Sequence, residues 1–111
     1  MKMDDVSVYQ GGQVVGGWAV VAIGGEKIVL GGDFFAYDFV DQLRLWGHEL
    51  AHIIQARTVP LYGQLLGSFN RYYGYFRNPL EVSAEWSGAA FASQILEKAI
   101  TPDDRYVKPQ Q

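Results

Sequence analysis

Cysteine is absent from this chain of 111 residues, so no disulfide framework can hold the fold together. A bound metal is then the one remaining cross-link that could stabilise so small a protein. A reducing compartment is permitted by this composition without being required.

Long apolar runs and an excess of basic residues are also missing. The longest apolar run, Trp18 to Ile23, is too short to cross a bilayer. The stretch from Met1 to Asp5 is acidic and polar, and no apolar segment of the signal-peptide type follows it. The net charge of -3 leaves no basic patch for nucleic acid. We therefore expect a soluble protein that contacts neither membrane nor nucleic acid, and that is cytoplasmic or exported by a non-classical route.

The composition that remains is that of one small globular domain. Apolar residues make up 49% of the chain and charged residues 19%, which argues against disorder over most of its length. A length of 111 residues allows a single core. We expect one domain over residues 1–111, with residues 102–111 as a flexible tail.

Both histidines stand in one stretch, His48-Glu49-Leu50-Ala51-His52, which has the pattern HExxH. Residues four apart share a face of a helix, so His48 and His52 can bind one tetrahedral zinc at about 2.0–2.1 Å. Glu49 then lies beside the metal, where it can take a proton from a zinc-bound water. The alternative is a buried helix whose two histidines have only hydrogen-bond partners.

A catalytic zinc needs a third protein ligand, and with no third histidine in the chain this ligand must be a carboxylate. Of the carboxylates after the motif, only Glu81 and Glu85 lie outside the tail and the far end of the last helix. They are four apart, so one can bind zinc while the other accepts the second ring proton of a histidine. Glu81 also stands where a capping-box carboxylate would follow Asn78, so ligand and cap are alternatives for it.

Short β-prone runs separated by glycine pairs precede the motif, and they predict strands joined by tight turns. Gly24-Gly25 predicts a hairpin turn. The four predicted strands are Val6–Tyr9, Gln13–Val15, Trp18–Ile23 and Lys27–Leu30.

The second half of the chain predicts helices. The motif helix is expected from about Phe39 to Arg57, apolar on nearly every face and therefore buried, with Asp38 as N-cap. A short helix and a loop are expected between Leu61 and Arg77. Asparagine followed by proline at residues 78–79 predicts the start of the last helix, which is expected to end near Ile100.

The motif, together with Glu81-Val82-Ser83-Ala84-Glu85 downstream, resembles the gluzincin zinc peptidases. Metzincins are disfavoured, because Gln55 and Thr58 stand where they have glycine and histidine. Residues 25–85 are also similar to the compact metallopeptidase-like domains associated with extracellular contractile injection systems. The shared features are a strand, a HELxHxxQ helix, an aromatic, glycine-rich connector and an NPxExxA start of the next helix. The minigluzincins are similar in size.

This resemblance implies a zinc peptidase with His48, His52 and Glu81 as ligands. Glu49 would be the general base, and Glu85 would hold the ring of His48 from behind the metal. The implied fold is α+β, a minimal zincin-like domain in which a small N-terminal twisted sheet packs on the HExxH helix and a second helix carries the glutamates. The substrate would be a peptide or protein. The alternative function is a zinc-stabilised interaction module, or assembly component, without turnover.

Two further expectations concern the substrate. The strand before the motif helix is expected to be an edge strand that pairs with an extended peptide through Ile28, Val29 and Leu30. Tyr75, or else Tyr72, is expected to stabilise the oxyanion that forms on attack.

The similarity to minigluzincins, whose terminal segments can block the site, suggests that the tail from Pro102 lies near the cleft and restrains activity. Asp103 or Asp104 would then occupy the open zinc position.

Overall fold

The computed structural model describes residues 7–10, 20–23, 27–30 and 32–107. Within these residues the body of the molecule consists of three α-helices: α1 (Phe39–Thr58), α2 (Tyr62–Tyr73) and α3 (Pro79–Leu96). Two short 3-10 turns, η2 (Gly32–Ala36) and η3 (Tyr75–Arg77), precede α1 and α3. None of the described helices combines the length and the apolar character that a membrane span requires.

Three strands of four residues each make a small sheet: β1 (Ser7–Gln10), β2 (Val20–Ile23) and β3 (Lys27–Leu30). The strand order is β1-β3-β2, with β3 parallel to β1 and antiparallel to β2. Ile28 lies opposite Val8 on one side and Ala22 on the other. The predicted strand at residues 13–15 and the predicted turn at residues 24–25 lie outside the described residues.

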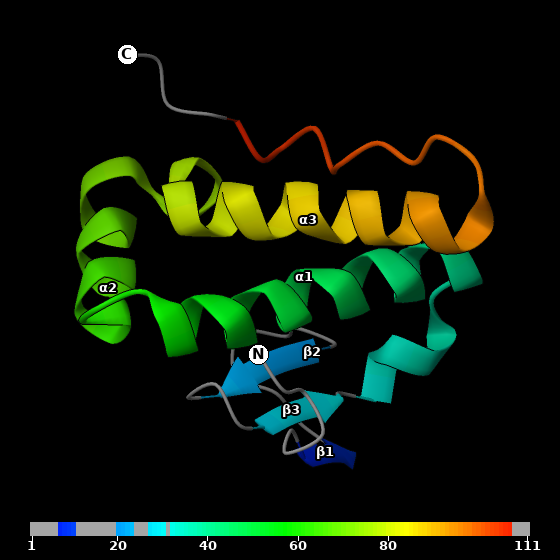
Figure 1. The fold of residues 1–111 in the computed structure, drawn as a ribbon, viewed down its shortest axis with the longest axis horizontal. Coiled ribbons are helices and arrows are strands. Elements are labelled where there is room, and N and C mark those ends of the chain that lie inside the picture. The colour runs from blue at the N-terminus through cyan, green and yellow to red at the C-terminus, as the bar shows by residue number, and fades with distance from the viewer. Residues whose placement is uncertain (1–6, 11–19, 24–26, 31, 108–111) are drawn as a thin grey trace.

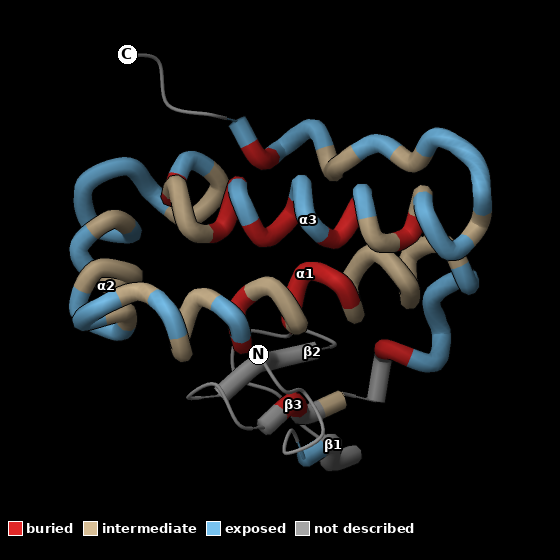
Figure 2. Tube along the Cα trace, viewed as in Figure 1, coloured by how far each residue is buried: buried red, intermediate tan, exposed pale blue. Residues whose placement is uncertain are grey.

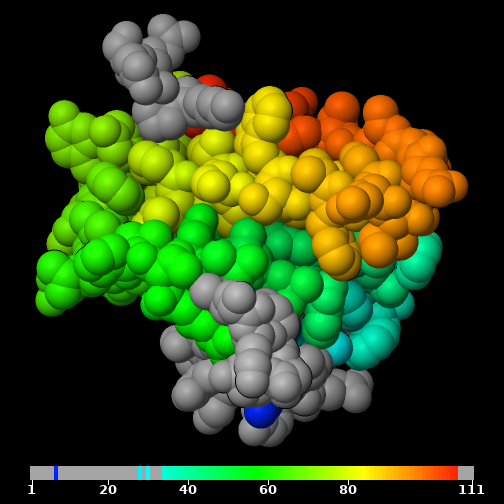
Figure 3. Space-filling model, in the orientation of Figure 1, coloured from blue at the N-terminus to red at the C-terminus, as the bar shows by residue number. Residues whose placement is uncertain are grey.

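The elements are stacked in layers, with α1 in the middle (Figure 1). The sheet lies on one side of α1 and α3 lies on the other, antiparallel to α1, while α2 closes one end of this pair. After α3 the chain turns back and runs along the outer side of that helix. In the space-filling view α1 (green) and α3 (yellow to orange) touch along their length (Figure 3).

The prediction of an α+β fold, in which a small N-terminal twisted sheet packs on the HExxH helix, is wrong in its fold class, because the structure is mostly helical. The α-helices have 20, 12 and 18 residues, whereas each strand has four. The most extensive contact between elements is the one between α1 and α3. The packing of two antiparallel helices, more than the sheet, therefore holds the described part of the fold together.

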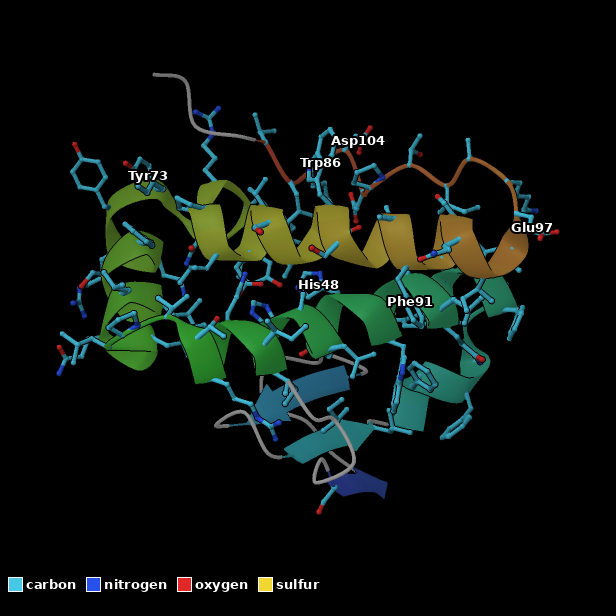
Figure 4. The ribbon with its side chains drawn as sticks, viewed as in Figure 1. His48, Tyr73, Trp86, Phe91, Glu97 and Asp104 are labelled. Carbon is cyan, nitrogen blue, oxygen red and sulfur yellow. The ribbon has the colours of Figure 1, made fainter. Side chains whose placement is uncertain are left out.

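Two glycines allow the close approach of α1 and α3. A Cβ atom on Gly88 would lie 2.3 Å from the carbonyl oxygen of Arg44 and 2.8 Å from the backbone nitrogen of His48. A Cβ atom on Gly47 would lie 2.8 Å from Cβ of Phe91, which Figure 4 places on α3. Any larger side chain at these positions would push the helices apart next to His48.

The predicted starts of both long helices are confirmed. Asp38 is the N-cap of α1, and its side chain accepts a hydrogen bond from the backbone nitrogen of Asp41 at 2.9 Å. Asn78 is the N-cap of α3, with Pro79 at the first helical position. Asn78 is fully buried, and its amide also donates to Leu66 and Asn70 of α2, so the start of α3 is tied to the preceding helix.

The buried residues lie mainly where α1 faces the sheet and where it faces α3 (Figure 2). Ile28 of β3 and Ile53 of α1 are completely buried and form the core on the sheet side, together with Phe34. On the other side, α3 presents a buried row at helical spacing: Glu81, Glu85, Gly88 and Ala92. This row directs two carboxylates towards α1.

Candidate metal centre

The two histidines of α1 point towards α3 and meet there. Figure 4 shows His48 in the space between the two helices. The Nε2 atoms of His48 and His52 are 3.2 Å apart, and the residues are only 2% and 7% exposed. The four-residue spacing on one helix face brings the rings together.

Glu81 of α3 completes this group. Its Oε1 atom lies 2.8 Å from Nε2 of His52 and 3.1 Å from Nε2 of His48. Three ligands on a tetrahedral zinc at about 2.0–2.1 Å would be separated by about 3.3–3.4 Å, close to these three distances. The three donor atoms therefore have the spacing of one face of a zinc coordination shell.

The carboxylate of Glu49 lies just beyond this group. Its Oε2 atom is 3.9 Å from Nε2 of His48, and a ligand atom of Glu49 falls within 4.8 Å of those of both histidines. Glu49 could thus be counted as a ligand in place of Glu81. Glu81, however, lies nearer to both imidazole rings, and Glu49 lies beside the group that Glu81 forms with them.

The outer nitrogen of each ring also has a partner. Nδ1 of His48 lies 2.8 Å from Oε1 of Glu85, where the sequence analysis placed this glutamate. Nδ1 of His52 lies 2.9 Å from Oε1 of Gln55 and 3.0 Å from the hydroxyl of Tyr62. A protonated Nδ1 that donates to these oxygens leaves Nε2 free to bind a metal.

Gln55 and Tyr62 were not assigned these roles from the sequence. Gln55 is three residues after His52 on the same helix, so its position could have been read from helix geometry. Its amide also donates to the carbonyl of Leu80, which links α1 to the start of α3. Tyr62 comes from α2, and no spacing rule connects that helix to the motif.

Glu85 is held from three directions, although it is almost completely buried. Besides His48 it pairs with Arg44, one turn earlier on α1, and accepts a hydrogen bond from the backbone nitrogen of Asp103 at 2.8 Å. Burial raises the pKa of Glu85, but the hydrogen bonds with His48, Asp103 and Arg44 lower it more. Glu85 is therefore kept as a carboxylate.

The C-terminal segment, residues 101–107, forms part of this site. Tyr106 is 8% exposed, its ring packs against His48 with centroids 5.6 Å apart, and its hydroxyl lies 2.9 Å from that of Tyr75. The backbone nitrogen of Val107 donates to the carbonyl of Phe76 at 2.9 Å. Up to Val107 the predicted tail is thus packed against the site; residues 108–111 lie outside the described residues.

The way in which the tail was expected to reach the metal is wrong. α3 ends at Leu96, not near Ile100, and Glu97 in the left-handed conformation begins the return of the chain. The side chain of Asp103 pairs with Arg105, and Asp104 is exposed. Instead, the ring of Tyr106 packs against His48, and the backbone N–H group of Asp103 donates to Glu85.

The predicted substrate strand is placed differently from expectation, and so is one predicted tyrosine. The strand that contains Ile28, Val29 and Leu30 is the central strand, paired on both sides, so the prediction that it is a free edge for substrate is wrong. The parallel pairing with β1 could not be read from the sequence. Tyr72 is 81% exposed and packs on Tyr73, and its role at the site stays a prediction.

Tyr75 does lie at the site. It lines a cavity together with His48 and Glu49. Burial, followed by the charge of Glu81, raises its pKa, so its hydroxyl stays protonated. Tyr75 can therefore donate a hydrogen bond beside the candidate metal position.

In the metal-free protein the stability should depend on pH through His48 and Glu81. Burial lowers the pKa of His48, but hydrogen bonds with Glu81 and Glu85 raise it more, to about 9. Burial raises the pKa of Glu81, but hydrogen bonds with His48 and His52 lower it more, to about 2. The stability that His48 contributes is fully present below its ordinary pKa of 6.5 and is lost as the pH rises to 9. The stability that Glu81 contributes is fully present above its ordinary pKa of 4.5 and is lost as the pH falls to 2.

We therefore expect the metal-free protein to be most stable between pH 4.5 and 6.5. Thermal unfolding in a chelator from pH 3 to 9 measures this, with Glu81→Gln as the comparison. A melting temperature of the unmutated protein that stays level from pH 6.5 to 9 would contradict the pairing of His48 with Glu81.

Comparison with known proteins found no significant match. No protein-family model matches the chain, and neither the curated proteins nor the solved structures contain a significant match.

Proposed function

We propose that this chain is a zinc-dependent peptidase of the gluzincin type, with His48, His52 and Glu81 as ligands and Glu49 as general base. The observation that carries the proposal is the position of Oε1 of Glu81, which lies within 3.1 Å of the Nε2 atoms of both histidines. The helices α1 and α3 thus bring three donor atoms close together.

The charges around this point favour a divalent cation. Glu49, Glu81 and Glu85 are buried there, and Arg44 pairs with Glu85. With neutral histidines the three carboxylates and one guanidinium have a formal charge of −2. Burial of uncompensated charge is costly, and one Zn²⁺ would balance it.

The residues of the chain have separate tasks in peptide hydrolysis. When bound, zinc would lower the pKa of a water towards about 7 and polarise the scissile carbonyl. Glu49 takes the proton of the attacking water and passes it to the leaving amine. Tyr75 donates a hydrogen bond to the oxyanion, and Glu85 and Gln55 keep the two imidazoles in orientation.

The decisive variant is Glu49→Gln, which keeps the size of the side chain and removes the base. We expect it to bind one zinc per chain and to cleave peptides about 10²–10⁴-fold more slowly than the unmutated protein. Mass spectrometry of a peptide-library digest measures cleavage, and metal analysis measures zinc. Glu97→Gln makes the same chemical change at an exposed position and should leave both unaltered. Equal cleavage by the Glu49 variant would overturn the mechanism.

A second candidate function is a zinc-stabilised module without turnover. It is favoured by the ring of Tyr106, which packs on His48 and helps to leave that histidine only 2% exposed. The same experiment separates the two: tight zinc binding, with no cleavage that depends on Glu49, is the result expected of the module.

A further inference from the structure

A cavity of about 240 Å³ opens beside the candidate metal centre. His48 and Glu49 form one of its walls, so whatever fills it lies next to the reacting bond of a bound peptide. Its other walls come from the chain before α1, from the first half of α1, from η3, from α3 and from the C-terminal segment. A cavity in this position would take a side chain of the substrate.

Part of the cavity lining is apolar and aromatic. This part consists of Leu45 and the tyrosines Tyr37, Tyr75 and Tyr106. The hydroxyls of Tyr75 and Tyr106 are hydrogen-bonded to each other. This part of the cavity therefore suits a stem of methylene groups better than a short polar side chain.

The lining also contains charged side chains. Arg44 pairs with both Glu85 and Asp41, and Arg105 makes a double ion pair with Asp103. Both guanidinium groups are thus already engaged with carboxylates, which disfavours an acidic substrate side chain. Asp41 keeps 45% of its side chain exposed and can accept another donor.

The formal charges around the cavity indicate which kind of substrate side chain would bind there. Zinc would balance the group of Glu49, Glu81, Glu85 and Arg44, and Arg105 balances Asp103. The formal charge left in the cavity is then the single negative charge of Asp41. An ammonium or guanidinium group on a long apolar stem satisfies both parts of the cavity.

We infer that this cavity is the subsite for a basic residue, lysine or arginine, next to the scissile bond, with Asp41 as the residue that selects it. This inference rests on the proposed peptidase function and names its substrate class. The stem of the basic residue lies against Leu45 and the tyrosine rings, and its charged head binds the carboxylate of Asp41.

The test uses the full zinc-loaded chain and matched peptides that differ at one flanking position, with lysine, arginine, glutamine, glutamate or phenylalanine. We expect the lysine and arginine peptides to be cleaved about tenfold better, by kcat/KM, than the glutamine peptide, the ratio that one partly exposed charged hydrogen bond gives. Asp41→Asn should reduce this ratio to near one. Asp104→Asn removes the same charge from an exposed neighbour that does not line the cavity, and should keep the ratio. Higher salt should lower it.

A second measurement separates this inference from the peptidase proposal. Zinc-loaded Glu49→Gln is expected to cleave about 10²–10⁴-fold more slowly, so fluorescence anisotropy of the labelled lysine and glutamine peptides reports binding to the subsite. Tighter binding of the lysine peptide that is lost with Asp41→Asn supports the subsite even where no peptide is cleaved. Equal binding of both peptides, or a preference for phenylalanine that Asp41→Asn leaves unchanged, would overturn it while the zinc chemistry still stands.

Discussion

Replacing Gly88 with alanine is expected to destabilise the fold by at least about 1–3 kcal/mol and to weaken zinc binding at the same time. The added Cβ atom would lie 2.3 Å from the carbonyl oxygen of Arg44 and 2.8 Å from the backbone nitrogen of His48. Backbone atoms cannot rotate away, so α3 must move from α1, and Glu81 moves with it. Denaturant unfolding and zinc titration measure the two effects.

A matched glycine serves as the control. Gly63 on α2 has nothing within 4 Å of the position that a Cβ atom would take. Gly63→Ala should therefore raise stability slightly, by about 0.5–1 kcal/mol, because alanine is the better helix former. If Gly88→Ala behaves like Gly63→Ala, the close crossing of α1 and α3 is not present in solution.

Removal of zinc is expected to have an effect of similar size. With no disulfide in the chain, metal binding adds directly to folding stability. Free zinc at 1,000 times its Kd would add about 4 kcal/mol, a shift in Tm of roughly 15 °C or more for a domain of this size. Calorimetry before and after chelation measures it, and an unchanged Tm after complete metal removal would contradict the site.

The same titrations test the assignment of each glutamate. Glu81→Ala should weaken zinc binding more than about 100-fold, because it removes a ligand, and Glu85→Gln should weaken it about 10–100-fold, because it removes a partner of a ligand. Glu97→Ala is the exposed control. Full zinc affinity in Glu81→Ala together with loss in Glu85→Ala would show that the ligand assignment is wrong.

The parts of the structure that could be predicted are those that depend on near neighbours in the chain. Helix geometry places His48 and His52 on one face, and the caps at Asp38 and Asn78 act within three residues of themselves. The row of Glu81 and Glu85 follows from the same periodicity. For these residues the sequence contains the whole physical cause.

The fold class could not be read in this way. Four β-prone runs predict a small sheet beside the helices, but the contribution of each layer to the fold depends on how much surface it buries. Packing of α1 on α3, made close by Gly47 and Gly88, outweighs a sheet of four-residue strands. Likewise, β3 is central because β1, distant in sequence, pairs with it.

By itself, the sequence determined which atoms are available for metal chemistry, since two histidines and the glutamates at helical spacing fix the donor types and their faces. Only the tertiary structure decided what surrounds them. Tyr62 on His52, Tyr106 on His48 and the Asp103 N–H group on Glu85 join segments 10 to 58 residues apart. No local rule spans such separations, because these contacts form only when α1 and α3 pack and the chain returns along α3 to the site.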